Sequence, residues 1–104
     1  MESFIEKNRQ ALEQLCQQYH VARLEVFGSA ATKDEFEPGR SDIDFLVEFA
    51  ESVGQRRFDN YFEFWEELKS LFGRPVDLVE PGGLRNPYFI RRVNETRRPI
   101  YVAT

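Results

Sequence analysis

Apolar side chains in the first part of the chain recur at the three- and four-residue spacing of a helix with one buried face. Ser3 precedes this stripe, and Glu6 stands three positions after Ser3. This spacing is typical of a capping box at a helix start. The pattern predicts one helix that ends before the segment 19–21. We expect its buried face to consist of Ile5, Asn8, Leu12, Leu15, Cys16 and Tyr19.

Alternation of apolar and polar residues predicts two strands in the middle of the chain. Residues 23–27 alternate and stop at Gly28. A short helical turn over 29–33 and a polar loop over 34–41 are expected next. Residues 42–49 give the clearest strand. Its apolar face holds Ile43, Phe45, Val47 and Phe49, and its other face holds Asp42, Asp44, Leu46 and Glu48.

The second half of the chain predicts a helix over 58–72, after a polar connector over 50–57, and a C-terminal stop at Gly73. A short strand over 75–79, a helix over 87–95 and an extended piece over 99–102, suited to a sheet edge, complete the series. The core stripe of the first of these helices is expected to be Phe58, Tyr61, Phe62, Trp65, Leu68 and Phe72, with Phe64 and Leu71 off it.

The order of elements is therefore helix, strand, turn, strand, helix, strand, helix, strand. This order predicts an α/β or α+β fold in which helices cover a small mixed sheet. With 104 residues, the chain is expected to form a single domain over 1–104.

The amino-acid composition indicates which partners and which cellular compartment to expect. Fourteen Lys and Arg against 18 Asp and Glu give a net charge of −4, which does not favour nucleic acid as the main partner. The single cysteine excludes an internal disulfide and predicts a cytoplasmic protein, and no apolar run is long enough for a membrane span. Aromatic residues make up 14% of the chain. Phe64, Leu71 and Tyr88 are either peripheral packing or an exposed patch for a partner.

Three aspartates on the predicted strands are candidates for metal binding. Asp42 and Asp44 are two residues apart and project from one face, and Asp77 lies within an apolar strand. If the strands are neighbours, the three carboxylates share one patch, and a bound Mg²⁺ or Mn²⁺ would remove their mutual repulsion. A solvated strand face, with Asp42 as a turn residue and Asp77 paired with Arg74, is the alternative.

The pair Gly28-Ser29 joins a strand end to a helical turn and is a candidate phosphate site. Backbone N–H groups and the Ser29 hydroxyl could bind an anion there, and glycine lets the backbone approach a phosphate closely. Alternatively, Gly28 only ends the strand and Ser29 only caps the turn. Neither the P-loop nor the Gly-x-Gly-x-x-Gly pattern is present.

Taken in order, these motifs resemble those of a known family. They are Val26-Phe27-Gly28-Ser29-Ala30-Ala31, Ser41-Asp42-Ile43-Asp44-Phe45-Leu46-Val47 and Val76-Asp77-Leu78-Val79. The chain is similar to the minimal nucleotidyltransferases of the DNA polymerase beta-like superfamily, above all to the small prokaryotic antitoxins that act beside HEPN-domain toxins.

The resemblance implies a nucleotidyltransferase fold, with ATP as substrate and Mg²⁺ (or Mn²⁺) as cofactor. It implies that Asp42 and Asp44 ligate both metals, that Asp77 ligates the catalytic metal, and that Gly28, Ser29 and Ser41 hold the nucleotide. The implied activity is transfer of AMP to a tyrosine hydroxyl of a partner HEPN RNase toxin, in a hetero-oligomer. Neutralisation by binding alone, and nucleotidyl transfer to a small molecule, are the alternatives.

Overall fold

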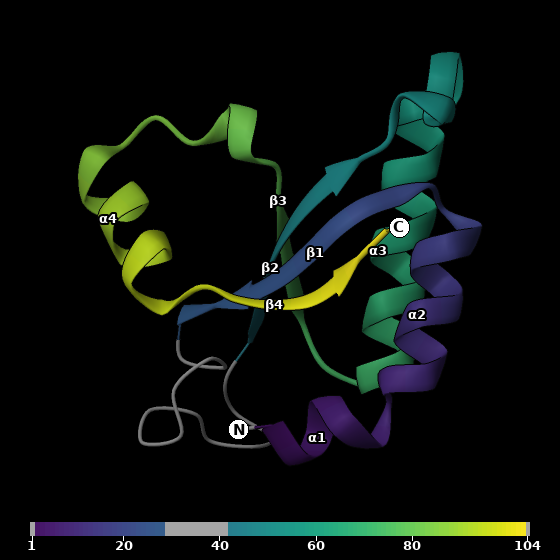
Figure 1. Cartoon of the computed structure of the whole chain (residues 1–104), viewed down its shortest axis with the longest axis horizontal. Helices are drawn as coiled ribbons and strands as arrows, with labels where there is room; N and C mark the ends of the chain where they lie inside the picture. Colours follow the sequence, from purple (N-terminus) through teal and green to yellow (C-terminus); the bar gives the residue numbers. More distant parts are fainter. Residues whose placement is uncertain (1, 29–41, 104) are drawn as a thin grey trace.

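The computed structural model describes residues 2–28 and 42–103. Four strands form one sheet in the order β3-β2-β1-β4 (Figure 1). β1 pairs antiparallel with both β2 and β4, and β2 pairs parallel with β3. The mixed sheet predicted from the order of elements is confirmed. The strands are β1 (Val21–Phe27), β2 (Ile43–Phe49), β3 (Val76–Val79) and β4 (Arg98–Val102).

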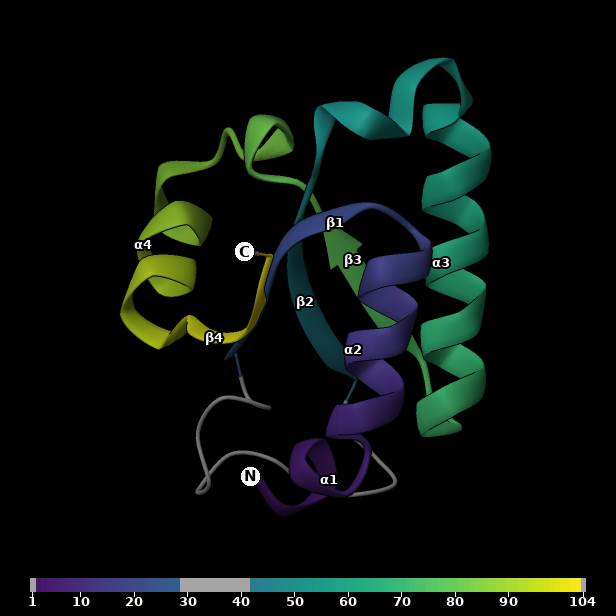
Figure 2. The same cartoon turned by 45° about the vertical axis from the view of Figure 1, so that its right-hand side comes forward.

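One face of the sheet holds the larger core. Figure 2 shows α2 (Arg9–Gln18) and α3 (Arg57–Phe72) lying along this face. Because side chains alternate along a strand, the residues 24, 26, 43, 45, 47, 76 and 78 all point to it. Its fully buried side chains include Leu12, Leu24, Phe45, Phe64 and Leu68.

The opposite face is covered in part by α4 (Pro87–Thr96), which Figure 2 places on the other side of the sheet. Asn86 caps this helix by accepting a hydrogen bond from the Tyr88 N–H at 2.9 Å. A small second cluster forms where α4 meets the strands, made of Phe27, Leu46 and Val93 with Val79 and Leu84 beside it. The sheet face predicted to carry the carboxylates therefore also carries apolar side chains, which pack against α4.

The predicted single N-terminal helix is two helices. α1 (Glu2–Lys7) and α2 are separated at Asn8, whose backbone (φ −110°, ψ 10°) lies outside the helical region. Ser3, the predicted N-cap residue, lies within α1. The change of direction still leaves Ile5, Leu12 and Cys16 buried, which is why the apolar spacing was continuous across the break.

The predicted core stripe of α3 was wrong in part. Phe58 is 79% exposed and Phe62 is 55% exposed, whereas Phe64, which was placed off the stripe, is fully buried. Tyr19 and Phe49 both contact its ring. Aromatic residues surround this helix on most sides, so two stripes at helical spacing compete, and only the packing against α2 and the sheet decides between them. Phe64 is thus a core residue and not part of a partner patch.

Side chains of α3 cover the outer edge of β3. Trp65 Nε1 donates a hydrogen bond to the Val76 carbonyl at 2.7 Å, and the Tyr61 hydroxyl donates one to the Leu78 carbonyl. Four helix positions rise about 6 Å and two strand positions about 6.6 Å, so donors at this spacing meet alternate carbonyls of β3, which runs antiparallel to the helix. The edge that holds Asp77 is thereby closed to pairing with another strand.

The other described elements agree with the sequence, while the predicted turn over 29–33 and loop over 34–41 lie outside the described residues. Gly73 ends α3 in the left-handed conformation (φ 65°), and β4 lies at the sheet edge with Pro99 in it. The connector after β2 contains a 3₁₀ helix, η2 (Glu51–Arg56), and a second short one, η3 (Pro81–Gly83), follows β3. In the described ranges, the helices are too short or too polar to cross a membrane.

Candidate functional site

Chain topology brings three of the predicted site residues to one end of the sheet. β1 ends at Phe27, which is the register partner of Asp44 near the start of β2. Because β3 runs parallel to β2, its early residue Asp77 is the register partner of Asp44 on the other side. Asp44 and Asp77 therefore lie side by side on two strands, and Gly28, just after β1, lies next to Asp44, so that the three residues form a row on the face that α4 covers in part. We call it the Gly28–Asp44–Asp77 row.

The carboxyl groups of the row interact strongly. Asp44 is half-buried, while Asp77 and Asp42 are exposed. Burial raises the pKa of Asp44 to about 7, helped by a hydrogen bond to the Asp77 carboxyl and by the negative charges of Asp77 and Asp42. The positive charge of Arg92, on α4, acts in the opposite direction. The repulsion expected from the sequence is thus present, and it is concentrated on Asp44.

Gly28 touches Asp44 without any side chain between them. Its backbone has a positive φ of 70°, and a Cβ atom placed on it would lie 2.7 Å from Asp44 Oδ2. Only glycine is compatible with this approach. The Gly28 N–H donates to the Thr96 hydroxyl at 2.8 Å, and nucleotide binding by Gly28 stays a prediction. Gly28 therefore serves the site by its shape, and its N–H is engaged with α4.

A small pocket of about 280 Å³ lies beside the row. Asp44 and Asp77 border it, and Phe89 of α4 and the α3 side chains Tyr61 and Trp65 also line it. The tyrosine hydroxyl is not free for chemistry, since it donates to the Leu78 carbonyl, and burial raises the Tyr61 pKa. The pocket suits a flat apolar group held next to two carboxyl groups.

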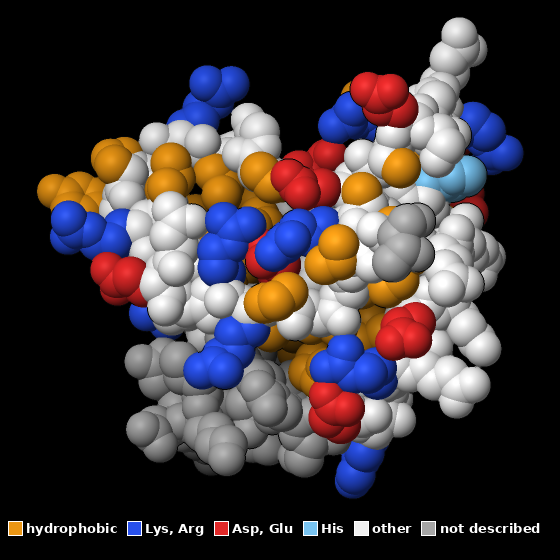
Figure 3. Space-filling view, in the orientation of Figure 1, with side chains coloured by type: hydrophobic (Ala, Val, Ile, Leu, Met, Phe, Trp, Pro, Cys, Tyr) orange, Lys and Arg blue, Asp and Glu red, His pale blue; other side chains and the backbone are white. Residues whose placement is uncertain are grey.

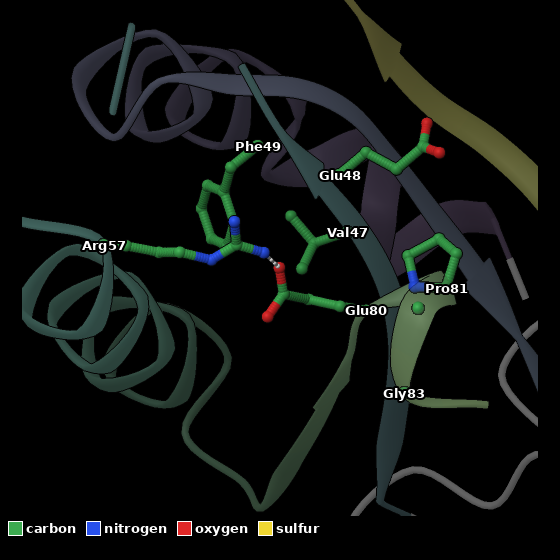
Figure 4. Close-up of a pocket in the computed structure, with 8 residues that line it drawn as sticks. Val47, Glu48, Phe49, Arg57, Glu80, Pro81 and Gly83 are labelled. Carbon is green, nitrogen blue, oxygen red and sulfur yellow. Dashed lines mark hydrogen bonds and ion pairs between the residues drawn. The ribbon is translucent and has the colours of Figure 1, made fainter. Parts of the chain in front are cut away.

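A larger hollow of about 490 Å³ lies at the other ends of β2 and β3 (Figure 4). An ion pair crosses it, with Arg57 Nη2 2.9 Å from Glu80 Oε1. The candidate carboxylates stand at the start of these strands and do not line it. The hollow is therefore separate from the Gly28–Asp44–Asp77 row.

The donor set suits a hard divalent cation, because it consists of carboxylate oxygens whose repulsion a cation would relieve. Over residues 2–28 and 42–103, no three His, Cys, Asp or Glu side chains are already arranged as a metal cluster. The structure holds a hydrogen-bonded Asp44–Asp77 pair, with Asp42 acting on it through its charge. Metal binding by these three residues stays a prediction. Ser29 and Ser41 lie outside the described residues.

Sequence reasoning missed the contribution of the C-terminal segment. Thr96 binds the Gly28 N–H, and its neighbour Arg97 donates to the buried Glu25 through Nε at 2.8 Å. Arg23 Nη2 donates to the same carboxylate at 2.9 Å. A signal was present in the alternation of β1, which places Glu25 on the same face as Phe27 and therefore under α4.

Comparison with known proteins identifies the class to which this fold and site belong. Residues 8–100 match the family described as "Nucleotidyltransferase domain". The match spans most of the chain, and the chain belongs to this family. A protein of Methanocaldococcus jannaschii named "Putative protein adenylyltransferase" is 40% identical over 81 residues, which is 78% of this chain and 78% of that protein.

Solved structures with the same fold include one described as "Structure of putative minimal nucleotidyltransferase". It superposes with a TM-score of 0.71 at 29% identity and covers 91% of each chain. A chain in the complex of a tri-AMPylated Shewanella oneidensis HEPN toxin with an MNT antitoxin superposes with a TM-score of 0.62. Its identity is 18%, over 94% of this chain and 72% of that one, so this likeness establishes the fold alone.

Proposed function

We propose that this chain is the antitoxin of a toxin–antitoxin pair and acts as a Mg²⁺-dependent protein adenylyltransferase. It would transfer AMP from ATP to a tyrosine hydroxyl of a partner HEPN RNase toxin. The observation that carries the proposal is the Gly28–Asp44–Asp77 row in a chain of the nucleotidyltransferase family. The names of its relative and of its structural neighbour support the choice of AMP and of a protein acceptor.

Asp42, Asp44 and Asp77 are the residues that would hold the divalent cation. When bound, it would neutralise the triphosphate and the pyrophosphate that leaves. The neighbouring carboxyl groups of Asp44 and Asp77 offer oxygen ligands for this cation. The backbone of Gly28, which carries no side chain, allows a phosphate to approach closely. Most of the rate enhancement would come from positioning and from charge neutralisation.

In the proposed reaction, the acceptor oxygen attacks the α-phosphorus of ATP. The bond from that phosphorus to the oxygen bridging to the β-phosphate breaks, and pyrophosphate leaves. The proton of the acceptor hydroxyl has to be removed, because a free tyrosine has a pKa of about 10. We assign the proton to Asp77, which is the exposed carboxylate of the row.

Exposed aromatic side chains near the site are candidates for contact with a protein acceptor. Tyr88 at the start of α4 is 82% exposed and Phe89 is 38% exposed. Figure 3 shows hydrophobic side chains gathered over the α4 side of the molecule. Phe89 also borders the pocket next to Asp77, so a partner that covers α4 would lie next to the proposed acceptor position.

The test is to incubate the partner toxin with this protein, Mg²⁺ and ATP, and then to weigh the toxin. We expect AMP adducts and loss of RNase activity, and neither when Mg²⁺ is omitted. The double variant Asp42→Ala with Asp44→Ala should add no AMP. Asp59→Ala, an exposed change in the first turn of α3, is the matched control. If the double variant neutralises the toxin as well as the wild type does, neutralisation occurs by binding alone.

A further inference from the structure

Thr96, the last residue of α4, connects two segments that are 68 positions apart in the chain. Its hydroxyl accepts a hydrogen bond from the Gly28 N–H at 2.8 Å and donates one to the Arg92 carbonyl at 2.7 Å. We propose that Thr96 is a positioning residue for nucleotide binding, which fixes the Gly28 backbone against Asp44. The proposal rests on the proposed function only in taking Mg²⁺-ATP as the ligand.

The chemistry of this position requires a hydroxyl group. A hydroxyl has one proton to donate and lone pairs to accept with, so it can bind the Arg92 carbonyl and the Gly28 N–H at once. Valine has the same shape as threonine and can do neither. Gly28 is buried, so its N–H would then lose its partner within the protein, which is costly. Serine keeps the hydroxyl and is the conservative replacement.

The residue after Thr96 anchors the same strand at a different point. Arg97 Nε donates to Glu25, which is 2% exposed and lies three positions before Gly28. Arg97 and Thr96 therefore hold two different parts of the same segment. Arg97 holds the body of β1, and Thr96 holds the corner where the chain leaves β1.

A small movement of this corner would reach the candidate metal site directly. Gly28 is close enough to Asp44 that a Cβ atom on Gly28 would lie 2.7 Å from a carboxylate oxygen. Thr96 is therefore linked to Asp44 through one hydrogen bond to Gly28 and the close approach of the Gly28 backbone to the Asp44 carboxyl group. Loss of the Thr96 hydroxyl should therefore lower the affinity for the triphosphate as well as the stability of the fold.

The experiment compares Thr96→Val, Thr96→Ser and the control Glu95→Ala, an exposed change one position earlier. Calorimetry gives the Kd for Mg²⁺-ATP, and NMR hydrogen exchange follows the Gly28 amide in the full chain. We expect Thr96→Val to raise Kd about tenfold, the equivalent of one lost hydrogen bond, and to speed exchange at Gly28. Thr96→Ser should restore both, and Glu95→Ala should change neither.

The proposal is overturned if Thr96→Val binds Mg²⁺-ATP as the wild type does, or if Thr96→Ser is as impaired as Thr96→Val. It is also overturned if the wild type binds no nucleotide. A wild type that binds Mg²⁺-ATP with this dependence on Thr96, but adds no AMP to the toxin, refutes the proposed function and leaves the positioning role of Thr96 intact.

Discussion

The carboxyl groups of Asp44 and Asp77 share a hydrogen bond across two parallel strands on which they are register partners. Two carboxyl groups can be joined in this way only when one of them carries a proton. Burial first, and then the bond to Asp77 and the negative charges of Asp77 and Asp42, raise the pKa of Asp44 to about 7. A proton and a divalent cation would therefore compete for this position.

Replacing Asp44 by asparagine should stabilise the protein and abolish nucleotidyl transfer. The amide can keep the hydrogen bond to Asp77 while removing the repelling charge. We expect a gain of about 1 kcal/mol at pH 7.5, or ~4–8 °C in Tm for a chain of this size, allowing for the partial exposure of the site. Thermal melting of the metal-free protein measures it, with the exposed Asp59→Asn on α3 as the control. Severe unfolding of Asp44→Asn would mean that Asp44 has a structural role instead.

The stability of the metal-free protein should fall as the pH rises from about 4, the pKa of an unfolded aspartate, to about 7, the value for Asp44 in the fold. A pKa raised by folding means that the folded state binds the proton more tightly. Its contribution is therefore complete below pH 4 and lost as the pH passes 7. Urea titrations between pH 4 and 8 measure it. The wild type minus Asp44→Asn difference should carry the slope, and a flat difference would contradict the assignment.

The sequence predicted this row well because its determinants are local. Alternation placed Asp42 and Asp44 on one face, the apolar neighbours of Asp77 indicated a strand, and the order of elements predicted the sheet. The parallel register that joins Asp44 to Asp77 could only be assumed. It depends on how α3 returns the chain to the sheet, which no local pattern encodes.

The errors arose where several apolar faces competed or where long-range contacts decided. On α3, Phe62 and Phe64 are both aromatic, and only tertiary packing buries the second and exposes the first. No local pattern indicated which group the Gly28 N–H would bond to. Its partner, Thr96, is supplied by a helix at the far end of the chain.

Substitution of Gly28 by alanine should damage the site more than its positive φ alone explains. The new Cβ would lie 2.7 Å from Asp44 Oδ2, so the carboxylate would have to move. Gly73→Ala is the matched control, since its φ of 65° is similar and nothing lies within 4 Å of its Cβ position. We expect both variants to lose about 1–2 kcal/mol of stability.

Only Gly28→Ala should also lose Mg²⁺-ATP binding and AMP transfer. Calorimetry and the mass assay on both alanine variants separate the two effects. Equal retention of nucleotide affinity by the two variants would show that the approach of Gly28 to Asp44 is irrelevant to the site.

The ion pairs of Glu25 with Arg97 and Arg23 should stabilise the fold more at neutral pH than at acidic pH. Burial alone would raise the Glu25 pKa, but the hydrogen bonds from Arg97 and Arg23 outweigh it and hold the pKa below its usual value. A lowered pKa contributes stability above about pH 4.3, the value in an unfolded chain, and the contribution is lost as the pH falls further. Arg97→Gln should therefore cost about 1–2 kcal/mol at pH 7, reduced by the partial exposure of Arg97, and less at pH 3.

Chemical denaturation at the two pH values measures this difference. Arg91→Gln, an exposed change on α4, is the control and should be near neutral at both. A cost for Arg97→Gln that does not depend on pH would show that packing of the side chain, and not its charge, holds β1 to the C-terminal segment.

The two hydrogen bonds from α3 to the edge of β3 should each contribute separately to the stability of the fold. Tyr61→Phe removes the donor to the Leu78 carbonyl and Trp65→Phe removes the donor to the Val76 carbonyl. Each change should cost about 1 kcal/mol in urea unfolding, because a carbonyl loses its partner. Tyr88→Phe, at a side chain that is 82% exposed, should cost almost nothing.

The double variant, Tyr61→Phe with Trp65→Phe, should also aggregate faster than either single variant, since it uncovers alternate carbonyls of an edge strand. If the double variant stays monomeric in light scattering at equal loss of stability, the two side chains only pack against β3 and do not protect its edge.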